Sequence, residues 1–528
     1  MPEIDRTMSG AVRAAYLDGQ EEERMEPLVR VGGDGRPVGR IGPGDAVIFY
    51  DIRGEREVEL TTAFVEPGFP HFEVESLGLH FVSMIEYDPA LPVGVAFPPL
   101  ERLADTLGEV VSRAGLRQLR VAESEKAVHV GYFLAGKRQE PFAGEERVTV
   151  RSPREPLAEP EMRASGVAAA VEAGLADPGV ALIVANLANV DVVGHNEDRA
   201  AVLRAVEAVD AAVGRMVDAA RRHDVVALVT ADHGTVERWL YPEGAVDTGH
   251  TDSPVPCVVV SPPDLHLPAL RTGGSLVDVA PTVLQLLGLQ VPAAMTGSSL
   301  LDSLARAVPR RVLLLVCDGW GMAPAGPANL ISQARTPVTD GLLAACPHVL
   351  LAASGEAVGL PPGTVGNSEA GHLHLGAGRV VPADRVRIAA AISDGSFFGN
   401  PALRGAAEAA RLSGRPLHLL GIVSFFSSHG SLDHLFALLE LARQVGVPEV
   451  WVHGLLGRRG ERPQSGAHYV GLVEERAADL GVGRVASVIG RYWALDREHH
   501  WDRVQRTYDL LVRGTGHPVK GLPLVPRG

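Results

Sequence analysis

The chain has 528 residues, of which 46% are hydrophobic, so it can bury sizeable cores and, as a prior, form about two to four domains. Its 64 acidic and 49 basic residues give a formal net charge of −15, which argues against a general surface for nucleic acids or other polyanions. The 3 cysteines, Cys257, Cys317 and Cys346, show no CxxC spacing, so neither a disulfide framework nor a thiolate metal site is indicated.

The N-terminal stretch MPEIDRTMSG contains no apolar run, so it does not resemble a signal peptide. No apolar run in the sequence approaches the ~18 residues that a membrane span requires. We therefore expect a cytoplasmic monomer that binds neither membranes nor nucleic acids. The chain ends in LVPRG, and we expect residues 521–528 to be the remnant of a cleavable tag or a disordered tail.

Short apolar runs rich in Val, Ile and Leu predict buried strands along the chain. They lie at residues 46–52, 180–188, 225–231, 311–317, 416–423 and 450–456. Between them, residues 198–223 carry apolar side chains at three- and four-residue steps, which predicts a helix that Asp198 can cap. Strands that alternate with helices indicate an α/β protein with largely parallel sheets.

Three of the predicted strands are followed by acidic residues, two of them with histidines close by. These residues are Asp191, His195, Asp232, His233 and Asp318, and His250 follows on a loop. In an open α/β sheet, ligands collect beyond the carboxyl ends of the strands. The acids would repel one another there unless a cation lay between them. Asp and His ligands together suit Mn²⁺ or Zn²⁺, and the oxygen-rich set favours Mn²⁺. A single Asp at a strand end is usually a turn or cap residue, but three such ends together favour a metal site.

Ser368 lies in the small-residue stretch GNSEAG, residues 366–371. Gly371 comes one residue too late for a G-x-S-x-G nucleophile elbow, so an α/β-hydrolase triad is not supported. The stretch predicts a tight turn into a helix N-terminus, where backbone N–H groups favour an anion. Two interpretations remain open from the local sequence. In the first, Ser368 caps that helix. In the second, Ser368 is a nucleophile that a metal ion activates.

Basic residues recur in turns that follow predicted strands. They include Arg53, Arg56, Arg459, Arg491 and Arg497, and elsewhere in the chain Lys126 and His429. Guanidinium groups bind phosphate and carboxylate oxygens in two-point contacts. Because most arginines are solvated surface residues, only their shared position after strands points to a small anionic ligand.

Many of these residues lie in longer motifs, among them CDGWG, VGLPPGTVGNSEAGHLHLGAGRVV, AESEKAVHVGYFLAG, TADHG, GHTDSPVP and IGRYWALDREHHWDRV. Through them the chain resembles the cofactor-independent phosphoglycerate mutases of the alkaline phosphatase superfamily. In that family the DGWG strand opens the protein and an MTGSSL-like segment closes it. Here MTGSSL, residues 295–300, precedes CDGWG. The resemblance therefore implies a circularly permuted order.

The resemblance implies a two-domain α/β fold. An alkaline-phosphatase-like, three-layer α/β/α domain is expected at residues 101–382. A smaller α/β transferase-like domain is expected to be assembled from residues 1–100 and 383–520. A permutation of this kind is compatible with folding if the old ends lie close together and the new ends fall in an exposed loop.

The resemblance also implies roles for individual residues. Asp191, His195 and His250 would hold one divalent ion, and Asp232, His233, Asp318 and Ser368 would hold the other. Ser368 would be the nucleophile that becomes a transient phosphoserine, with Lys126 assisting at the domain interface. Phosphoglycerate would be bound by Arg53, Arg56, His429, Arg459, Arg491 and Arg497. The implied cofactors are two Mn²⁺ ions, or Zn²⁺, without 2,3-bisphosphoglycerate, and the implied reaction interconverts 3-phosphoglycerate and 2-phosphoglycerate.

The chain departs from the family pattern around the implied glycerate site. A DGRD-like stretch is replaced by GRRG, which puts Gly457 and Gly460 where the family has acids, and the stretch around His429 reads FSSHGS. These departures keep two alternatives open. One is a metal-dependent phosphohydrolase or another phosphomutase of the superfamily, and the other is a catalytically weak phosphoglycerate-binding protein.

Overall fold

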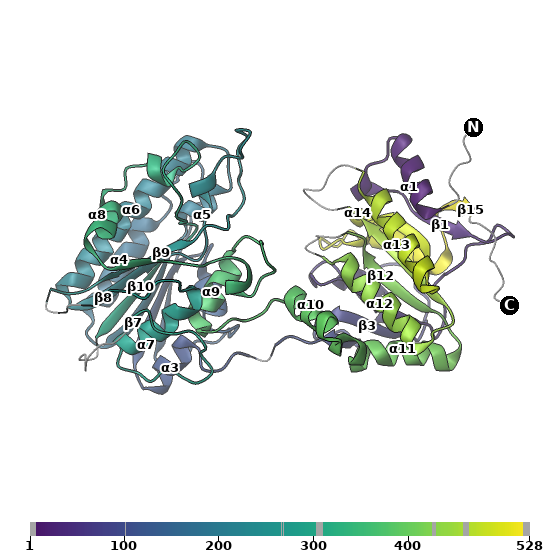
Figure 1. Cartoon of the computed structure of the whole chain (residues 1–528), viewed down its shortest axis with the longest axis horizontal. Coiled ribbons are helices and arrows are strands. Elements are labelled where there is room, and N and C mark those ends of the chain that lie inside the picture. The colour runs from purple at the N-terminus through teal and green to yellow at the C-terminus, as the bar shows by residue number, and fades with distance from the viewer. Residues whose placement is uncertain are drawn as a thin grey trace. The chain divides into compact units, whose positions relative to one another are not determined.

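The computed structural model describes residues 7–100, 102–263, 265, 267, 269–301, 310–424, 429–457 and 464–520. The chain divides into two compact units (Figure 1). Unit 1 comprises Met1–Pro99 and Asp384–Gly528, and unit 2 comprises Leu100–Ala383. The names transferase-like and phosphatase-like for these two parts stay predictions. The expected tail at residues 521–528 and the candidate Arg459 lie outside the described residues.

Unit 2 is built on a seven-stranded sheet in the order β11-β9-β8-β10-β7-β5-β6. Its strands are β5 (Arg117–Glu123), β6 (Glu145–Val150), β7 (Val180–Leu187), β8 (Val225–Thr230), β9 (Val255–Val260), β10 (Arg311–Cys317) and β11 (His348–Leu351). The five strands from β8 to β6 run parallel, whereas β9 and β11 join antiparallel at one edge. The three central strands β7, β8 and β10 are almost continuously apolar, as expected where helices cover both faces of a sheet, whereas β5 and the edge strand β6 carry several charged residues.

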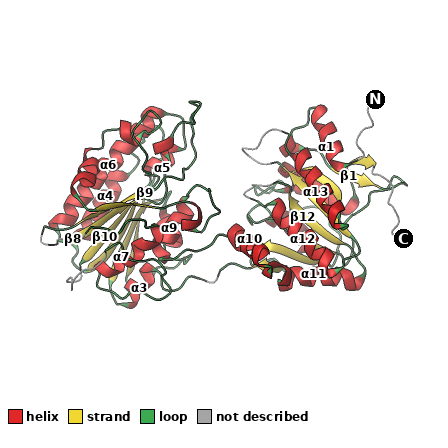
Figure 2. Ribbon diagram, in the orientation of Figure 1, coloured by secondary structure: helices red, strands yellow, loops and turns green. Residues whose placement is uncertain are grey.

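Helices lie on both sides of this sheet, which makes unit 2 a three-layer α/β/α structure (Figures 1 and 2). One layer contains α4 (Ala164–Ala176), α6 (Arg199–Arg222) and α8 (Pro337–Ala345), and the other contains α3 (Leu107–Arg113), α7 (Val279–Leu286) and α9 (Ser368–Ala377). The short α5 (Asn189–Gly194) follows β7 directly, and a one-turn π-helix, η2 (His129–Phe133), follows β5. This architecture confirms the expected α/β fold class.

The sequence pattern explains why these segments form. The predicted helix at 198–223 is α6, and the Asp198 carboxylate accepts hydrogen bonds from the N–H groups of Ala200 and Ala201 at its start. Its apolar stripe is buried, including Val202, Val209 and Met216. The predicted strands are confirmed, although β2 ends at Phe49 rather than at residue 52.

Unit 1 contains an eight-stranded sheet in the order β15-β1-β14-β13-β12-β2-β3-β4. Its strands are β1 (Leu28–Val31), β2 (Ala46–Phe49), β3 (His80–Ile85), β4 (Gly94–Phe97), β12 (Leu417–Ile422), β13 (Val450–Leu456), β14 (Arg484–Gly490) and β15 (His517–Lys520). Strand β2 pairs in parallel with β12, with Ala46 opposite Leu417. The two ends of the chain therefore share one sheet and one hydrophobic core.

Helices from both ends of the chain also cover this sheet. They are α1 (Met8–Leu17), α2 (Val58–Val65), α10 (Asp384–Asp394), α11 (Pro401–Ser413), α12 (Leu432–Val445), α13 (Gly466–Leu480), α14 (Arg491–Ala494) and α15 (Trp501–Tyr508). The N-terminal α1 packs on α13, where the Glu474 carboxylate accepts hydrogen bonds from the backbone N–H groups of Met8 and Ser9 at 2.8 and 3.1 Å. A carboxylate at this end also complements the helix dipole.

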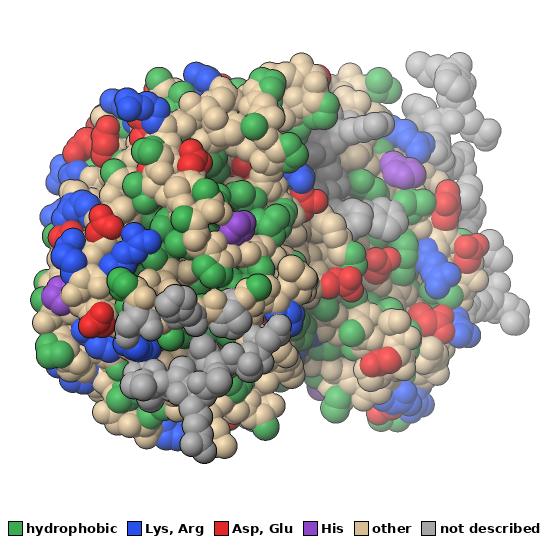
Figure 3. Space-filling model, turned by 60° about the vertical axis from the view of Figure 1, so that its left-hand side comes forward, with side chains coloured by type: hydrophobic (Ala, Val, Ile, Leu, Met, Phe, Trp, Pro, Cys, Tyr) green, Lys and Arg blue, Asp and Glu red, His purple; other side chains and the backbone are tan. Residues whose placement is uncertain are grey.

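In the described part of the chain, no helix is both long and apolar enough to cross a membrane. Acidic and basic side chains are interspersed over the face shown in Figure 3.

Buried histidines predict that unit 1 loses stability in acid. His434 on α12 is 2% exposed, and burial, with Arg385 nearby, lowers its pKa from 6.5 to about 3. Between these two pH values, His434 is therefore protonated in the unfolded chain but neutral in the folded chain. The contribution of His434 to the free energy of unfolding should be constant above about pH 6.5 and fall by about 1.4 kcal/mol per pH unit from there to about pH 3.

Thermal unfolding measured against pH checks this expectation. The variant His434→Leu should have a shallower acid slope than the parent chain, and the same change at the exposed His223 should leave the slope unaltered. If the melting temperature fell equally steeply with acid in all three proteins, His434 would not be the cause of the acid sensitivity.

Candidate metal centre

The acidic residues that follow three neighbouring strands converge at one edge of the unit 2 sheet. Strand β10 lies between β7 and β8, and all three run parallel. Asp318 directly follows β10, Asp232 follows β8, and Asp191 lies on α5 just after β7. All three are at least 95% buried. The sheet register therefore places three carboxylates together where parallel strands end.

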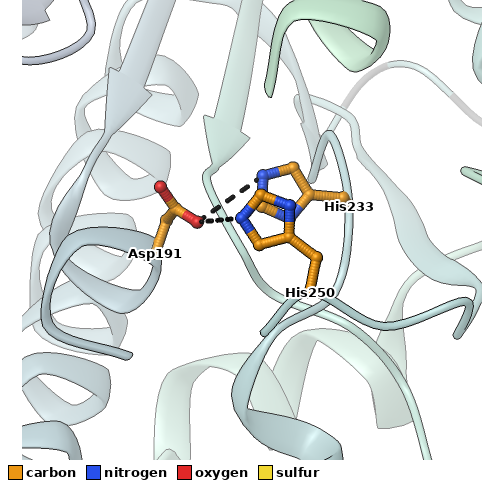
Figure 4. Close-up of side chains that lie close together, drawn as sticks. All are labelled: Asp191, His233 and His250. Carbon is orange, nitrogen blue, oxygen red and sulfur yellow. Dashed lines mark ion pairs between the residues drawn. The ribbon is translucent and has the colours of Figure 1, made fainter. Parts of the chain in front are cut away.

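The first group of side chains surrounds one oxygen of Asp191. Asp191 Oδ1 lies 3.1 Å from His250 Nε2, 3.4 Å from His195 Nε2 and 3.6 Å from His233 Nε2. His195 Nε2 and His250 Nε2 lie 3.2 Å apart. Figure 4 shows Asp191, His233 and His250 directed toward one another. Their ligand atoms lie within 4.8 Å of one another, which is compact enough for one metal ion.

The second group is completely buried and shares His233 with the first. His233 Nε2 lies 3.5 Å from Asp232 Oδ2 and 3.5 Å from Asp318 Oδ1. The ligand atoms of these three residues also lie within 4.8 Å of one another. His233 thus lies between the two groups rather than belonging to one alone.

Ser368 opens helix α9 directly beside the second group. Its Oγ lies 3.0 Å from His233 Nε2 and donates to Asp318 Oδ1 at 3.3 Å. The helix cap is Asn367, whose side chain accepts from the N–H of Ala370. The interpretation of Ser368 as the cap is therefore wrong, because the neighbouring residue fills that role and leaves the serine hydroxyl in the acidic cluster.

Lys126 joins the carboxylates and the serine. Its Nζ donates to Asp191 Oδ2 at 2.6 Å, to Ser368 Oγ at 2.7 Å and to Asp318 Oδ1 at 2.8 Å. Burial alone would lower the pKa of Lys126, but the charges of Asp318, Asp191 and Asp232 outweigh it and raise the pKa above its usual value. The ammonium group therefore stays charged and partly neutralises the three acids.

The three histidines of the cluster are oriented by backbone carbonyl groups. His195 Nδ1 lies 2.8 Å from the carbonyl oxygen of Thr248, and His250 Nδ1 lies 2.9 Å from that of Gly366. His233 Nδ1 lies 3.2 Å from the carbonyl oxygen of Gly234. A carbonyl partner at Nδ1 favours a proton on that nitrogen, so that Nε2 is the nitrogen available to a metal ion, as in many metal sites.

Sequence reasoning missed two residues that lie beneath the cluster. The Asn186 amide donates to Asp318 Oδ2 at 2.7 Å and lies 3.0 Å from His372 Nε2. His372 Nδ1 lies 3.2 Å from Asp232 Oδ2 and 2.9 Å from the Ser368 carbonyl oxygen. The only signals in the sequence were a polar residue inside an apolar strand run and a histidine one helical turn after Ser368.

Replacement of Asn186 by alanine should weaken metal binding. Without the amide, Asp318 loses the hydrogen bond that orients it, and loss of such outer partners typically costs about 10–100-fold in metal affinity. Titration of the metal-free chain with Mn²⁺ measures the change. Asn329→Ala, a buried asparagine elsewhere in unit 2 that bonds the carbonyl oxygen of Ala323, is the matched control. Equal affinities of the two variants would show that Asn186 does not orient the site.

The basic candidates in unit 1 form a second cluster. Glu55 Oε1 accepts from Arg53 Nε at 2.9 Å and from Arg497 Nη1 at 2.8 Å. Arg56 also contributes to lowering the pKa of Glu55, and its Nη1 donates to the carbonyl oxygen of Leu495 at 3.1 Å. The structure therefore brings Arg53, Arg56 and Arg497 together.

His429 and Arg491 lie around two buried acids of the same unit. His429 Nδ1 is 2.8 Å from Glu57 Oε1, and both side chains are fully buried. Burial and the charge of Glu57 raise the pKa of the buried Asp51, whereas Arg491 opposes this rise. The ligand atoms of Asp51, Glu57 and His429 also lie within 4.8 Å of one another. Arg491 lies close enough to lower the pKa of Asp51, so a cationic side chain already faces these acids.

The donor set in unit 2 fits divalent metal ions. Asp191 Oδ1 and Asp232 Oδ2 are buried carboxylate oxygens whose nearest polar neighbours are imidazole nitrogens, none of them in good hydrogen-bond geometry among the described residues. Such oxygens are costly to bury unless a cation or a donor reaches them. Carboxylate oxygens mixed with imidazole nitrogens are typical ligands of Mn²⁺ and Zn²⁺. The residues present are therefore those that a metal centre requires.

Comparison with known proteins agrees with this chemistry. Residues 38–291 match the family described as the metalloenzyme superfamily, and residues 388–522 match the family described as the BPG-independent PGAM N-terminus. The chain is therefore similar to the metalloenzyme superfamily over one part and to BPG-independent phosphoglycerate mutases over another. The family resemblance predicted from the sequence is confirmed, and metal dependence agrees with it.

Relatives named 2,3-bisphosphoglycerate-independent phosphoglycerate mutase match parts of the chain. The protein from Moorella thermoacetica is 50% identical over 214 residues, which are 40% of this chain and 42% of the relative. The protein from Thermomicrobium roseum is 42% identical over 290 residues, which are 53% of this chain and 55% of the relative. The match thus spans only part of each relative.

A solved structure is also similar. It is described as Leishmania mexicana phosphoglycerate mutase at low cobalt concentration, with 29% identity and a TM-score of 0.38. The similarity covers 51% of this chain and 52% of the other.

Proposed function

We propose that the chain is a phosphoglycerate mutase that interconverts 3-phosphoglycerate and 2-phosphoglycerate through a phosphoserine at Ser368. One observation carries this proposal. The Ser368 hydroxyl lies within hydrogen-bond distance of Lys126, His233 and Asp318, between two groups of metal-ligand side chains.

Two divalent ions would complete the site, and we propose Mn²⁺ or Zn²⁺, with the oxygen-rich donor set favouring Mn²⁺. Asp191, His195 and His250 would hold one ion, and Asp232, His233, Asp318 and Ser368 the other. When bound, the ions would supply positive charge to the phosphoryl group during transfer.

The side chains of unit 2 then perform the transfer. Ser368 Oγ forms the new bond to phosphorus while the bond between phosphorus and the glycerate oxygen breaks. The Ser368 proton is directed at Asp318 Oδ1, and the Lys126 ammonium donates to Oγ and favours its anionic form. The released glycerate oxygen takes up the proton that Ser368 gave up. In the second transfer, the other glycerate hydroxyl forms a bond to phosphorus and gives up its proton, while the bond between phosphorus and Ser368 Oγ breaks and Oγ is protonated again. The net reaction is therefore an isomerisation.

We propose that the basic cluster of unit 1 binds the glycerate part of the substrate. Its members are Arg53, Arg56, His429, Arg491 and Arg497, with Arg459 added from the sequence alone. Guanidinium forks suit the substrate carboxylate. Gly457 and Gly460 stand where the family pattern has acids, so this stretch of the sequence carries two fewer negative charges.

We further propose that the chain is circularly permuted relative to the usual family order. Two observations support this. The domain described as an N-terminus matches residues 388–522, after the metalloenzyme match at 38–291. In addition, unit 1 is assembled from both ends of the chain, whereas unit 2 is continuous.

A metal-removal experiment tests the function. Chelation of the full chain should abolish formation of 2-phosphoglycerate from 3-phosphoglycerate, and Mn²⁺ should restore it. Free phosphate should be measured in the same samples, because the metal groups of unit 2 would equally serve a phosphohydrolase. Phosphate release without isomerisation would favour that alternative, and binding of phosphoglycerate without turnover would favour a catalytically weak binding protein.

A further inference from the structure

Unit 2 contains a cavity of about 490 Å³ that lies apart from the acidic cluster. Strands β5 and β6 form its floor, and η2 and the segment at Gln139 complete its wall. Cavities of 300–1,000 Å³ with mostly apolar walls and a few polar groups are typical small-molecule sites. The lining of this cavity combines Ala122, Val130, Tyr132 and Val148 with the two arginines Arg120 and Arg147.

The register of the sheet places these two arginines side by side. Arg120 on β5 is directly opposite Arg147 on β6. Like charges directly opposite each other destabilise a pair of strands unless something compensates. The carboxylate between them belongs to Glu145, whose Oε1 is 2.5 Å from Arg147 Nε and whose Oε2 is 3.9 Å from Arg120 Nε. Two guanidinium groups therefore share one acid, which leaves one positive charge in excess.

This pair is only partly bonded. The side chain of Arg120 is 2% exposed and that of Glu145 is 1% exposed, whereas that of Arg147 is 26% exposed. Arg120 Nη2 donates to Gln118 Oε1, and Arg147 Nη1 donates to the carbonyl oxygen of Gln139. Among the described residues, Arg120 Nε and Nη1 and Arg147 Nη2 have no hydrogen-bond partner. Burial, together with the charge of Arg147, lowers the pKa of Arg120 even though Glu145 opposes the change. Unsatisfied donors of a buried charged group are costly, and an anion in the cavity beside Arg147 would offset the excess charge of the pair.

A glycine lets the backbone of η2 approach the second arginine closely. A Cβ atom at Gly131 would lie 3.2 Å from Arg147 Nη1. Gly131 lies on η2, one turn after Lys126, whose carbonyl oxygen accepts from the N–H of Val130 at 3.1 Å. Any larger residue at this position would occupy the space beside the guanidinium group.

We propose that this cavity binds a small oxyanion with a short apolar body, whose carboxylate or phosphate oxygens lie at Arg120 and Arg147. We expect an anionic group because the arginine pair carries an excess positive charge. We expect an apolar body because most of the cavity lining is apolar. The site belongs to unit 2 alone and does not depend on the proposed mutase reaction.

Thermal shift measurements on the full Mn²⁺-loaded chain test the proposal. Benzoate and inorganic phosphate are the two probes, each titrated at constant ionic strength, because a bound ligand raises the stability of the folded state. The variants are Arg147→Met, which removes one guanidinium, and Gly131→Leu, which keeps both arginines but fills the space. Arg138→Met is the control, since Arg138 lies near the cavity but stacks on Phe142 at 4.8 Å.

At least one probe should stabilise the parent chain, and its apparent Kd should rise at least about tenfold in Arg147→Met and Gly131→Leu but not in the control. Loss of benzoate binding alone would identify a carboxylate site, and loss of phosphate binding alone a phosphate site. If Arg147→Met does not fold, the apparent Kd of the probe for Gly131→Leu tests the proposal. The proposal is overturned if neither probe stabilises the parent chain or if the variants respond as the parent does. Phosphate binding that persists in both variants belongs to another site, such as the proposed catalytic centre.

Discussion

Ser368→Ala should lose mutase turnover by a factor on the order of 10⁶, as expected when a nucleophile is removed. In the proposed mechanism the Ser368 hydroxyl accepts the phosphoryl group, and alanine leaves no hydroxyl beside Lys126, His233 and Asp318. Measurement of 2-phosphoglycerate formation by the Mn²⁺-loaded variant gives the answer. The alanine fills less space but removes no backbone contact, so the fold should persist.

The control for this variant is Ser354→Ala. Ser354 also belongs to unit 2, and its Oγ donates to the backbone carbonyl oxygen of Asp252 away from the cluster. Its replacement should leave turnover within about twofold of the parent chain, since surface changes rarely exceed about 0.5 kcal/mol. Ordinary turnover by Ser368→Ala would refute the serine mechanism whatever the control does.

The second large effect is expected at Lys126. Lys126→Met keeps much of the side-chain volume but removes the ammonium group that contacts Asp191, Asp318 and Ser368. Turnover should fall by roughly 10²–10³-fold, the usual cost of losing one preorganised donor at a developing charge. Metal-free Lys126→Met should also melt at a lower temperature than the metal-free parent, because three buried acids lose their nearest cation.

Mn²⁺ should restore much of the melting temperature of Lys126→Met but not its turnover. Recovery of the melting temperature without recovery of turnover would show that Lys126 has a catalytic role beyond a structural one. The exposed Lys137→Met is the matched control and should change neither quantity. Full recovery of turnover with Mn²⁺ would mean that Lys126 only neutralises the acids.

The strands and the positions of the acids could be predicted from the sequence because both depend on residues that are adjacent in the chain. Continuous Val, Ile and Leu runs such as β8 and β10 are typical of buried strands between helices, and their carboxyl ends meet at one edge of the sheet. The sequence pattern was therefore sufficient to predict that Asp191, Asp232 and Asp318 lie together.

Other features depend on contacts that a linear sequence does not display. The position of His233 between both ligand groups arises from the register of β8 against β10, and Asn186 and His372 act through neighbours more than 100 residues away. Likewise, Arg120 and Arg147 become a pair only through the parallel register of β5 and β6. The choice between Ser368 and Asn367 as helix cap was also beyond local sequence, because both residue types cap helices well.

The most direct test of the central claim is to identify the residue that carries the phosphoryl group during turnover. The Mn²⁺-loaded chain would be mixed with 3-phosphoglycerate, quenched in acid within the first turnovers, digested and analysed by mass spectrometry. The account predicts phosphate on Ser368 in the peptide that contains GNSEAG, and none in samples without metal. Turnover that proceeds with phosphate on another residue, or on none, would contradict it.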